Sequence, residues 1–313
     1  MLMNLSEYAA RPKHFVLHNP RLFNELRAIS SDTLSKHHYT HVPDTSLLYE
    51  QYDTFQETLK ETGVRVLELA DLLSTSQRHH LQDLCDPNAM FTRDPVITLP
   101  WAPNVFVPAR FALQSRAQSG VVFQKALTNL GMKSIARFTG DEYVEGGDVL
   151  PLWHDGMRWL LVGYGGRTTK AGARALARQL VPAYADMVVG LRHRESALHL
   201  DTGFSVLTPH LALVVSNMFS GGFVADNVKE GRIEPTDYLH FLGIDSLPIT
   251  NQDALERQLC NVLPLGNKKF VTFQLPTHLN QELSSHGLHL YEVNGSELAK
   301  AVGGTHCLTR PIY

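Results

Sequence analysis

The chain has 313 residues, 43% of them hydrophobic and 19% charged, which is enough apolar material for a full hydrophobic core and excludes a disordered protein. The 28 basic and 31 acidic residues give a formal charge of −3, so no broad basic surface is available to bind nucleic acid. The three cysteines (Cys85, Cys260 and Cys307) are too few and too far apart for a disulfide framework or a cysteine-based zinc site.

The sequence contains no pattern typical of export or membrane insertion. The longest apolar runs, such as residues 211–215, fall far short of the roughly 20 residues that a membrane-spanning helix needs. Residues 1–10 lack the basic and then apolar order of a signal peptide. We therefore expect a cytoplasmic protein without a membrane partner. Because no linker divides the chain, we also expect a single domain over residues 1–313.

The first predicted helix begins at a cap provided by Asp44 or Thr45 and ends at Gly63. Its apolar side chains recur every three to four residues, at Leu47, Leu48, Tyr52, Phe55 and Leu59. The residues that follow directly, 64–69, predict a β-strand.

The middle of the chain predicts a hairpin and then a helix. Residues 148–153 and 159–163 read as two strands joined by a turn at 154–156. A helix over 168–180 and a strand over 187–191 come next.

A second predicted hairpin comprises residues 204–207 and 211–216, followed by a helix over 236–242 and a strand over 247–249. Hairpins between helices fit a doubly wound parallel sheet poorly. The order of elements instead predicts an α/β fold built from a repeated unit of roughly 60 residues, each with antiparallel strands and one helix.

Four short stretches combine acidic, histidine or cysteine residues with glycine or turn residues, namely residues 87–95, 145–148, 199–203 and 303–309. Asp94 and Glu145 are 51 residues apart, and Glu145 and His199 are 54 apart, which is close to the length of the predicted unit. We therefore expect successive units to place these ionisable groups around a common centre.

Cys307 is the candidate nucleophile. A small buried hydrophobe is the ordinary role of a free cysteine. Here Gly303 and Gly304 permit an unusual backbone and close approach of a ligand, while His306 and Thr309 give the thiol polar neighbours. A nucleophilic thiol needs a lowered pKa, or a cationic substrate that favours the thiolate.

The acidic candidates each have an ordinary alternative role. His199 and Asp201 are two residues apart, so on a strand both would point to one face, either exposed to solvent or buried with partners. Glu145 could be a turn residue, or a carboxylate beside glycines where backbone approaches a ligand. Asp94, before Pro95, could be a cap or a turn residue.

Three carboxylates meeting at one buried point would repel one another unless a cation lies between them. A metal would normally bind the thiol as well, and the paired histidines at 37–38 and 79–80 lack metal-binding spacing, so we expect no metal site. A guanidinium is flat and rich in hydrogen-bond donors, and it matches carboxylates in bidentate pairs. The charges therefore favour a guanidinium ligand facing the thiol.

At these residues the sequence resembles the superfamily of guanidino-group-modifying enzymes, which comprises arginine deiminases, dimethylarginine dimethylaminohydrolases and amidinotransferases. The matching stretches are residues 91–94, 145–148 and 199–201, and the Gly-Gly-X-His-Cys-X-Thr segment around Cys307. The resemblance implies a five-bladed α/β propeller without a cofactor. It also implies a catalytic domain that hydrolyses arginine or a related guanidino compound through a covalent thiouronium adduct, giving a ureido product and ammonia or an amine.

The same resemblance implies roles for individual residues. Cys307 would be the nucleophile, His199 the general acid and base, and Glu145 the group that orients His199. The remaining candidates would bind the substrate: Asp94 and Asp201 at the guanidinium, Asn88 and Arg167 at the α-carboxylate with help from Arg110 or Arg116, and Phe91 within the matching stretch. Because an acid is present at Asp201, unmethylated guanidines are favoured over dimethylarginine.

Three alternatives stay open at this point. An amine could intercept the adduct, which would make the protein an amidinotransferase, or the substrate could be a dimethylarginine. A third alternative is a binding module that retains the guanidinium site without catalysis. The partners expected are a small guanidino substrate and, in a homodimer, a second copy of the chain.

Overall fold

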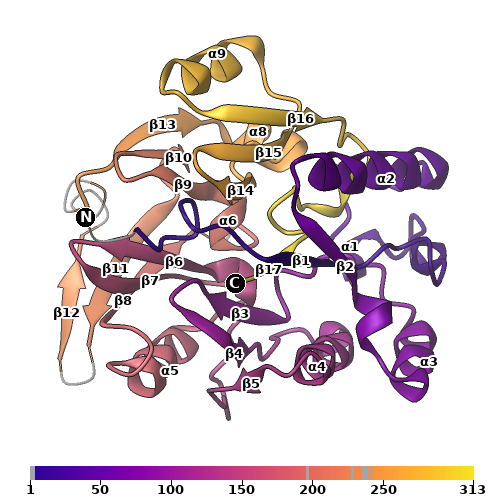
Figure 1. Ribbon diagram of the computed structural model, residues 1–313, viewed down its shortest axis with the longest axis horizontal. Helices are drawn as coiled ribbons and strands as arrows, with labels where there is room; N and C mark the ends of the chain where they lie inside the picture. The colour runs from indigo at the N-terminus through magenta and orange to yellow at the C-terminus, as the bar shows by residue number, and fades with distance from the viewer. Residues whose placement is uncertain (1–3, 195–196, 227–228, 235–238, 240–241) are drawn as a thin grey trace.

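The strands of the described residues lie in five small sheets, each of which mixes parallel and antiparallel pairing. The computed structural model describes residues 4–194, 197–226, 229–234, 239 and 242–313. In Figure 1 the sheets are arranged around the middle of the molecule, and helices α2, α4, α5 and α9 lie toward its periphery. The α/β class is confirmed.

Each sheet has a core of three strands, in which the middle strand pairs antiparallel with one neighbour and parallel with the other. The five-stranded sheet adds two further antiparallel pairs. Two sheets are formed by strands between residues 96 and 233. One comprises β3 (Val96–Leu99), β4 (Ala102–Pro108) and β5 (Lys133–Ser134), and the other comprises β6 (Val149–His154), β7 (Met157–Tyr164) and β8 (Met187–His193), extended by β11 (Phe219–Ala225) and β12 (Glu230–Ile233).

Two further sheets follow the same pattern. They comprise β9 (Phe204–Thr208), β10 (Leu211–Val215) and β13 (Asp245–Ile249), and then β14 (Leu263–Gly266), β15 (Lys269–Phe273) and β16 (His289–Val293). The first strands of these four units begin at residues 96, 149, 204 and 263, so the predicted repeat is found in the fold.

The fifth sheet joins the two ends of the chain. Its strands are β17 (Arg310–Ile312), β1 (His14–Leu17) and β2 (Arg65–Glu68), with β1 antiparallel to β17 and parallel to β2. The C-terminal strand therefore completes a unit that begins near the N-terminus. Because β17 directly follows the segment that carries Cys307, this pairing also fixes the position of Cys307 in the molecule.

Among the described residues, helices connect the strands of the parallel pairs β1–β2, β4–β5, β7–β8 and β15–β16, or lie between the units. The longer ones are α2 (Thr45–Glu61), α3 (Thr75–Leu84), α4 (Gln114–Asn129), α5 (Lys170–Leu180) and α9 (Thr277–Ser285). The shorter ones are α1 (Leu34–His37), α6 (Leu200–Gly203) and α8 (Asn251–Arg257), with 3-10 turns η1 (Glu25–Ala28), η2 (Leu69–Leu72), η3 (Gly146–Asp148) and η4 (Leu298–Ala301). Among the described residues no helix has the length and apolar character needed to cross a membrane.

The predicted α2 is confirmed in position and cap. Asp44 Oδ1 accepts a hydrogen bond from the Leu47 amide at 3.1 Å, and Gly63 adopts the left-handed conformation just beyond the helix. Four of the five apolar side chains that predicted the helix are fully buried, at Leu48, Tyr52, Phe55 and Leu59, whereas Leu47 is exposed. Burial of each such side chain stabilises the fold by roughly 1.5 to 3 kcal/mol.

Some predicted boundaries were wrong by a few residues. The helix expected from residue 168 begins at Lys170, because Thr169 is its cap and accepts from the Gly172 amide at 3.0 Å. The strand expected from residue 148 begins at Val149, because Gly146–Asp148 forms a helical turn. The helix expected over 236–242 lies almost entirely outside the described residues.

Candidate active site

Side chains from distant segments line one cavity of about 310 Å³, counted with the space at its mouth. Its lining residues are His37, His38, Asn88, Phe91, Asp94, Arg116, Arg167, Leu198, His199, Ala301, Val302 and Cys307. The structure thus brings together six of the nine predicted site residues at the cavity wall. Two more, Glu145 and Asp201, directly contact side chains in that wall.

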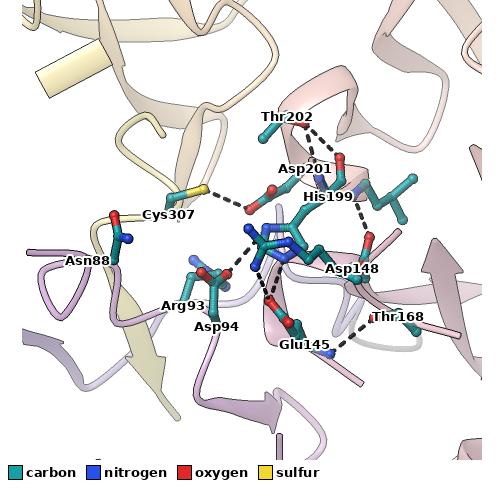
Figure 2. A network of polar contacts seen from close by, with 12 residues as sticks. Asn88, Arg93, Asp94, Glu145, Asp148, Thr168, His199, Asp201, Thr202 and Cys307 are labelled. Atoms are coloured by element: carbon teal, nitrogen blue, oxygen red, sulfur yellow. Dashed lines mark hydrogen bonds and ion pairs between the residues drawn. The ribbon is translucent and has the colours of Figure 1, made fainter. Parts of the chain in front are cut away.

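His199 lies between two carboxylates. Its Nε2 is 2.9 Å from Glu145 Oε2, and its Nδ1 is 3.6 Å from Asp94 Oδ1 (Figure 2). Burial disfavours the charged imidazole, but the nearby Asp94 and Glu145 outweigh burial and raise the pKa of His199 to about 9. At neutral pH the ring is therefore a cation that can donate a proton.

The strand considered for His199 and Asp201 is not found. His199 caps the short helix α6, and the Leu200 amide donates to Asp148 Oδ1 at 2.8 Å. Because the backbone turns here, the His199 and Asp201 side chains do not share a strand face. His199 contacts Asp94 and Glu145, whereas Asp201 contacts Cys307.

The glycines after Glu145 allow the carboxylates and the imidazole to meet. A Cβ atom at Gly147 would lie 2.9 Å from both Asp94 Oδ1 and His199 Nδ1, closer than real Cβ contacts come. Any side chain at this position would therefore separate His199 from Asp94. The Gly-Gly pair in the sequence marks this close approach.

Arg116 and Arg167 reach the same carboxylates from the other side. Arg116 Nη1 donates to Asp94 Oδ2 at 2.6 Å, and Arg167 Nη1 donates to Glu145 Oε2 at 3.3 Å. Burial opposes ionisation of Asp94, but His199 and Arg116 outweigh it and lower the pKa of the Asp94 carboxyl group. Asp94 is therefore an anion at neutral pH.

Arg110, named with Arg116 as a candidate for the substrate carboxylate, does not line the cavity. Its guanidinium donates to the Phe138 carbonyl at 3.1 Å and stacks over the Tyr143 ring at 5.1 Å. A backbone bridge to Val144 holds its segment at the end of β4. Of the two arginines, the structure places Arg116 at the cavity.

Asn88 and Phe91 occupy the wall near Cys307. Asn88 Nδ2 donates to the His37 carbonyl at 3.1 Å, which links the segment before β3 to the end of α1. The Phe91 ring packs directly on Gly303, where a Cβ atom would lie 2.3 Å from the ring. Gly303 is thus required for the nucleophile's segment to approach Phe91.

The Cys307 thiol is 3% exposed and is held by Asn261, a residue that the sequence analysis missed. Asn261 Nδ2 donates to Cys307 Sγ at 3.0 Å, and its Oδ1 accepts from the Gly304 and Cys307 amides. Asn261 belongs to none of the recognised stretches, so no local signal in the sequence indicated it.

Asp201 faces the thiol, as Figure 2 shows. Its Oδ2 is 3.4 Å from Cys307 Sγ and 2.8 Å from His306 Nδ1, while its buried Oδ1 has no hydrogen-bond partner among the described residues. His306 Nε2 lies 3.4 Å from Glu7, which pairs with Arg93. Glu7 also escaped the sequence analysis, because it is far from every recognised stretch.

The carboxylates disfavour a thiolate in the free protein. Burial, Asp201 and Asp94 together raise the pKa of Cys307 well above its ordinary value. A cation placed between these carboxylates would offset their effect on the thiol. The cavity therefore combines a thiol, a protonated imidazole and acidic groups arranged for a small cation.

Three side chains of the site are of the types that bind metal ions. Within the described residues, Asp94, Glu145 and His199 offer ligand atoms within 4.8 Å of one another. Arg116 and Arg167 already pair with the two carboxylates, and two guanidinium groups beside a metal ion would repel it. Both carboxylates of this group therefore already have cationic partners.

The comparisons with known proteins place the chain in the superfamily of guanidino-group-modifying enzymes. The sequence model of the family described as arginine deiminase matches residues 75–313. An arginine deiminase from Mycobacterium avium (strain 104) is 31% identical over 252 residues, which are 72% of this chain and 60% of that protein. One from Rhodococcus jostii (strain RHA1) is 28% identical over 254 residues, with the same coverage.

Solved structures share the fold at lower identity. The N-terminal domain of ArgZ, described as an arginine dihydrolase from cyanobacteria, has a TM-score of 0.72 at 20% identity and covers 96% of this chain and 97% of its own. A dimethylarginine dimethylaminohydrolase has a TM-score of 0.67 at 18% identity, with coverage of 96% and 99%. The chain belongs to the arginine deiminase family. It spans about 60% of the length of the curated relatives.

Proposed function

We propose that this protein is a cysteine-dependent hydrolase of a guanidino compound, with free arginine as the leading substrate. The observation that carries the proposal is the position of Cys307 opposite a protonated His199 across one cavity with Asp94 and Asp201. Curated relatives of the family are named arginine deiminases, which supports arginine as the substrate class.

In the proposed mechanism the substrate guanidinium binds between Asp94 and the free oxygen of Asp201. Its positive charge offsets the carboxylates that disfavour the thiolate, so the thiol releases its proton to solvent when the substrate binds. The sulfur then attacks the guanidinium carbon while His199 donates a proton to the departing ammonia. Glu145 keeps the imidazole oriented through its 2.9 Å hydrogen bond.

The second half of the reaction reuses His199. The neutral imidazole takes a proton from water, which attacks the carbon of the thiouronium adduct. Collapse of the resulting intermediate breaks the carbon–sulfur bond and releases a ureido product, which for arginine is citrulline. Cys307 returns to the thiol and His199 to the cation.

Arg116 and Arg167 are the residues proposed to hold the α-carboxylate of the substrate, with Asn88 beside them. Both guanidinium groups are buried at the cavity and carry fixed positive charge. The sequence alone left the choice between Arg110 and Arg116 open, and we assign this role to Arg116.

We also propose that residues 1–313 form one catalytic domain with the arrangement of a five-bladed propeller. Five units with the same strand pairing support this arrangement. The pairing of β1 with β17 supports closure of the ring by the two ends of the chain. No cofactor is needed for the proposed reaction.

The test is to identify the products by mass spectrometry after incubation with arginine, methylated arginines, agmatine and citrulline. Citrulline and ammonia from arginine are the expected products. A parallel incubation with arginine and glycine tests for amidino transfer. Formation of ornithine and a new guanidino acid would contradict the proposed hydrolysis. Turnover of methylated arginines alone would instead indicate a dimethylarginine hydrolase, and absence of turnover with intact binding would indicate a binding module.

A further inference from the structure

One oxygen of Asp201 is shared between the nucleophile and a second histidine. Asp201 Oδ2 lies 3.4 Å from Cys307 Sγ and 2.8 Å from His306 Nδ1, and all three residues are buried. Because a carboxylate oxygen accepts hydrogen bonds, Nδ1 is the ring nitrogen of His306 that carries the donated proton. The imidazole and the thiol therefore donate to the same oxygen.

The His306 ring is held on its other side by Glu7. Glu7 Oε1 lies 3.4 Å from His306 Nε2 and forms an ion pair with Arg93. Arg93 also donates from Nε to the His306 carbonyl at 3.1 Å, so both the ring and the backbone of His306 are fixed. Rotation of the ring would leave a buried carboxylate without one of its partners, which is costly in a protein interior.

Glu7 belongs to the segment before β1, which crosses the middle of the molecule in Figure 1. The Glu7 amide donates to the Pro151 carbonyl at 3.1 Å, and the Ser6 hydroxyl accepts from the Trp153 amide at 2.7 Å. These two bonds anchor the segment on β6. The segment lies outside residues 75–313, the part of the chain that matches the family model.

The charged groups near this contact come from four segments. Asp201 lies on α6, Glu7 precedes β1, Arg93 precedes β3, and the charge of Arg310, on β17, acts on Glu7. Of these four, Asp201 and Glu7 contact the His306 ring. The effect of replacing His306 would therefore reach Cys307 through Asp201.

We propose that His306 is a positioning residue, which holds Asp201 beside the Cys307 thiol and is itself held by Glu7. Its hydrogen bond to Oδ2 keeps the carboxylate from turning fully toward the thiol. This role rests on the proposed function, in which Asp201 binds the substrate guanidinium. It adds a layer behind the site, since neither Glu7 nor His306 is part of the cavity lining.

The pH dependence of Cys307 alkylation by iodoacetamide tests this role without any turnover. When the imidazole is removed, Asp201 Oδ2 accepts more strongly from the thiol and disfavours the thiolate further. We therefore expect the alkylation profile of His306→Leu to move to higher pH by about one unit. Peptide mass spectrometry distinguishes Cys307 from Cys85 and Cys260. His306→Asn, whose amide N–H can replace Nδ1 as donor, should keep a profile close to that of wild type.

Two further variants serve as control and as safeguard. His18→Leu also removes a buried histidine that lies between two carboxylates, but outside the cavity, so it should leave the Cys307 profile unchanged. Glu7→Gln leaves the imidazole in place and guards against misfolding of His306→Leu. It should shift the profile in the same direction by a smaller amount, because the ring is held less firmly.

A double-mutant cycle on arginine turnover, with rates taken per folded molecule, shows whether His306 acts through Asp201. We expect His306→Leu to lower kcat/KM about 100-fold in wild type and less than about twofold in the Asp201→Asn background. Equal losses in both backgrounds would overturn the proposal, as would Cys307 profiles of His306→Leu and Glu7→Gln that match wild type. If arginine is not turned over, the proposed function fails while the alkylation profiles still decide the role of His306.

Discussion

Two buried histidines of this protein each lie between two carboxylates, but only one of them borders the cavity. His18, just after β1, lies 2.7 Å from Glu25 and 3.0 Å from Glu68, and His199 lies between Asp94 and Glu145. In both places burial disfavours the cation but the carboxylates outweigh it, raising the pKa of His18 to about 10 and that of His199 to about 9.

The difference lies in what each ring borders. His199 lines the cavity that contains Cys307, whereas His18 is fully buried and is not part of that lining. An imidazole between two acids is therefore no indication of catalysis by itself, because the same arrangement also serves to fasten η1 to β1 and β2. The nearby thiol and the space for a ligand are what make His199 a candidate acid.

The largest expected effect comes from the nucleophile. Cys307→Ser should lower turnover of arginine by more than about 1,000-fold, because a serine hydroxyl is a far weaker nucleophile without a strong base beside it. Rapid-quench mass spectrometry should show a covalent adduct on wild-type Cys307 and none on the variant. Cys260→Ser is the control, since Cys260 is equally buried and does not line the cavity. Wild-type turnover by the Cys307 variant would contradict the mechanism.

Substitution of each of the two histidines distinguishes an effect on catalysis from an effect on folding. His199→Asn should lower kcat by about 100-fold to 10,000-fold through loss of the proton donor. His18→Asn should leave kcat per folded molecule nearly unchanged. Steady-state kinetics on protein whose folded fraction is measured by circular dichroism provides the comparison, and equal losses in both variants would mean that the effect at His199 is structural.

His18→Asn should instead destabilise the fold. Without the cation, Glu25 and Glu68 lose their buried partner, which typically costs about 3 kcal/mol in the free energy of unfolding. Urea denaturation of the variant and wild type measures this difference. An unchanged midpoint would show that the His18 cluster does not stabilise the protein.

The two arginines near β4 give a smaller contrast. Arg116→Gln should raise KM for arginine about tenfold to 100-fold, because it removes a buried charge proposed to hold the substrate carboxylate. Arg110→Gln is expected to change KM less than about twofold, since its guanidinium contacts Phe138 and Tyr143 outside the cavity. A larger KM effect at Arg110 would reverse the assignment.

The smallest effect is a dependence of stability on pH. The pKa of His18 is about 10 in the folded protein and about 6.5 ordinarily, so its contribution to stability is complete below about pH 6.5 and is lost as the pH rises through 10. The stability difference between wild type and His18→Asn should therefore shrink between pH 7 and pH 10. Urea denaturation of both proteins at several pH values measures this difference. A stability difference that grew from pH 7 to pH 10 would contradict the prediction.

Much of the site was predictable because its chemistry lies in short stretches. Glu145 before two glycines and Cys307 after two glycines are local signals, since only glycine permits the close approaches seen at Gly147 and Gly303. The strand considered for His199 and Asp201 is not found, because the hydrogen bond from Leu200 to Asp148 favours a helical turn there. That bond joins residues 52 apart in sequence, so no local pattern contains it.

The sequence by itself determined the types of reactive group, their spacing by one structural unit and the guanidinium-like cation that would balance them. Only the tertiary structure decided that Asn261 holds the thiol, that Arg116 rather than Arg110 faces the cavity, and that β17 closes a sheet with β1. The physical reason is that a short motif reflects the backbone conformation and the close contacts required at its own segment. Contacts between distant residues depend on how whole units pack, and that packing leaves no short pattern along the chain.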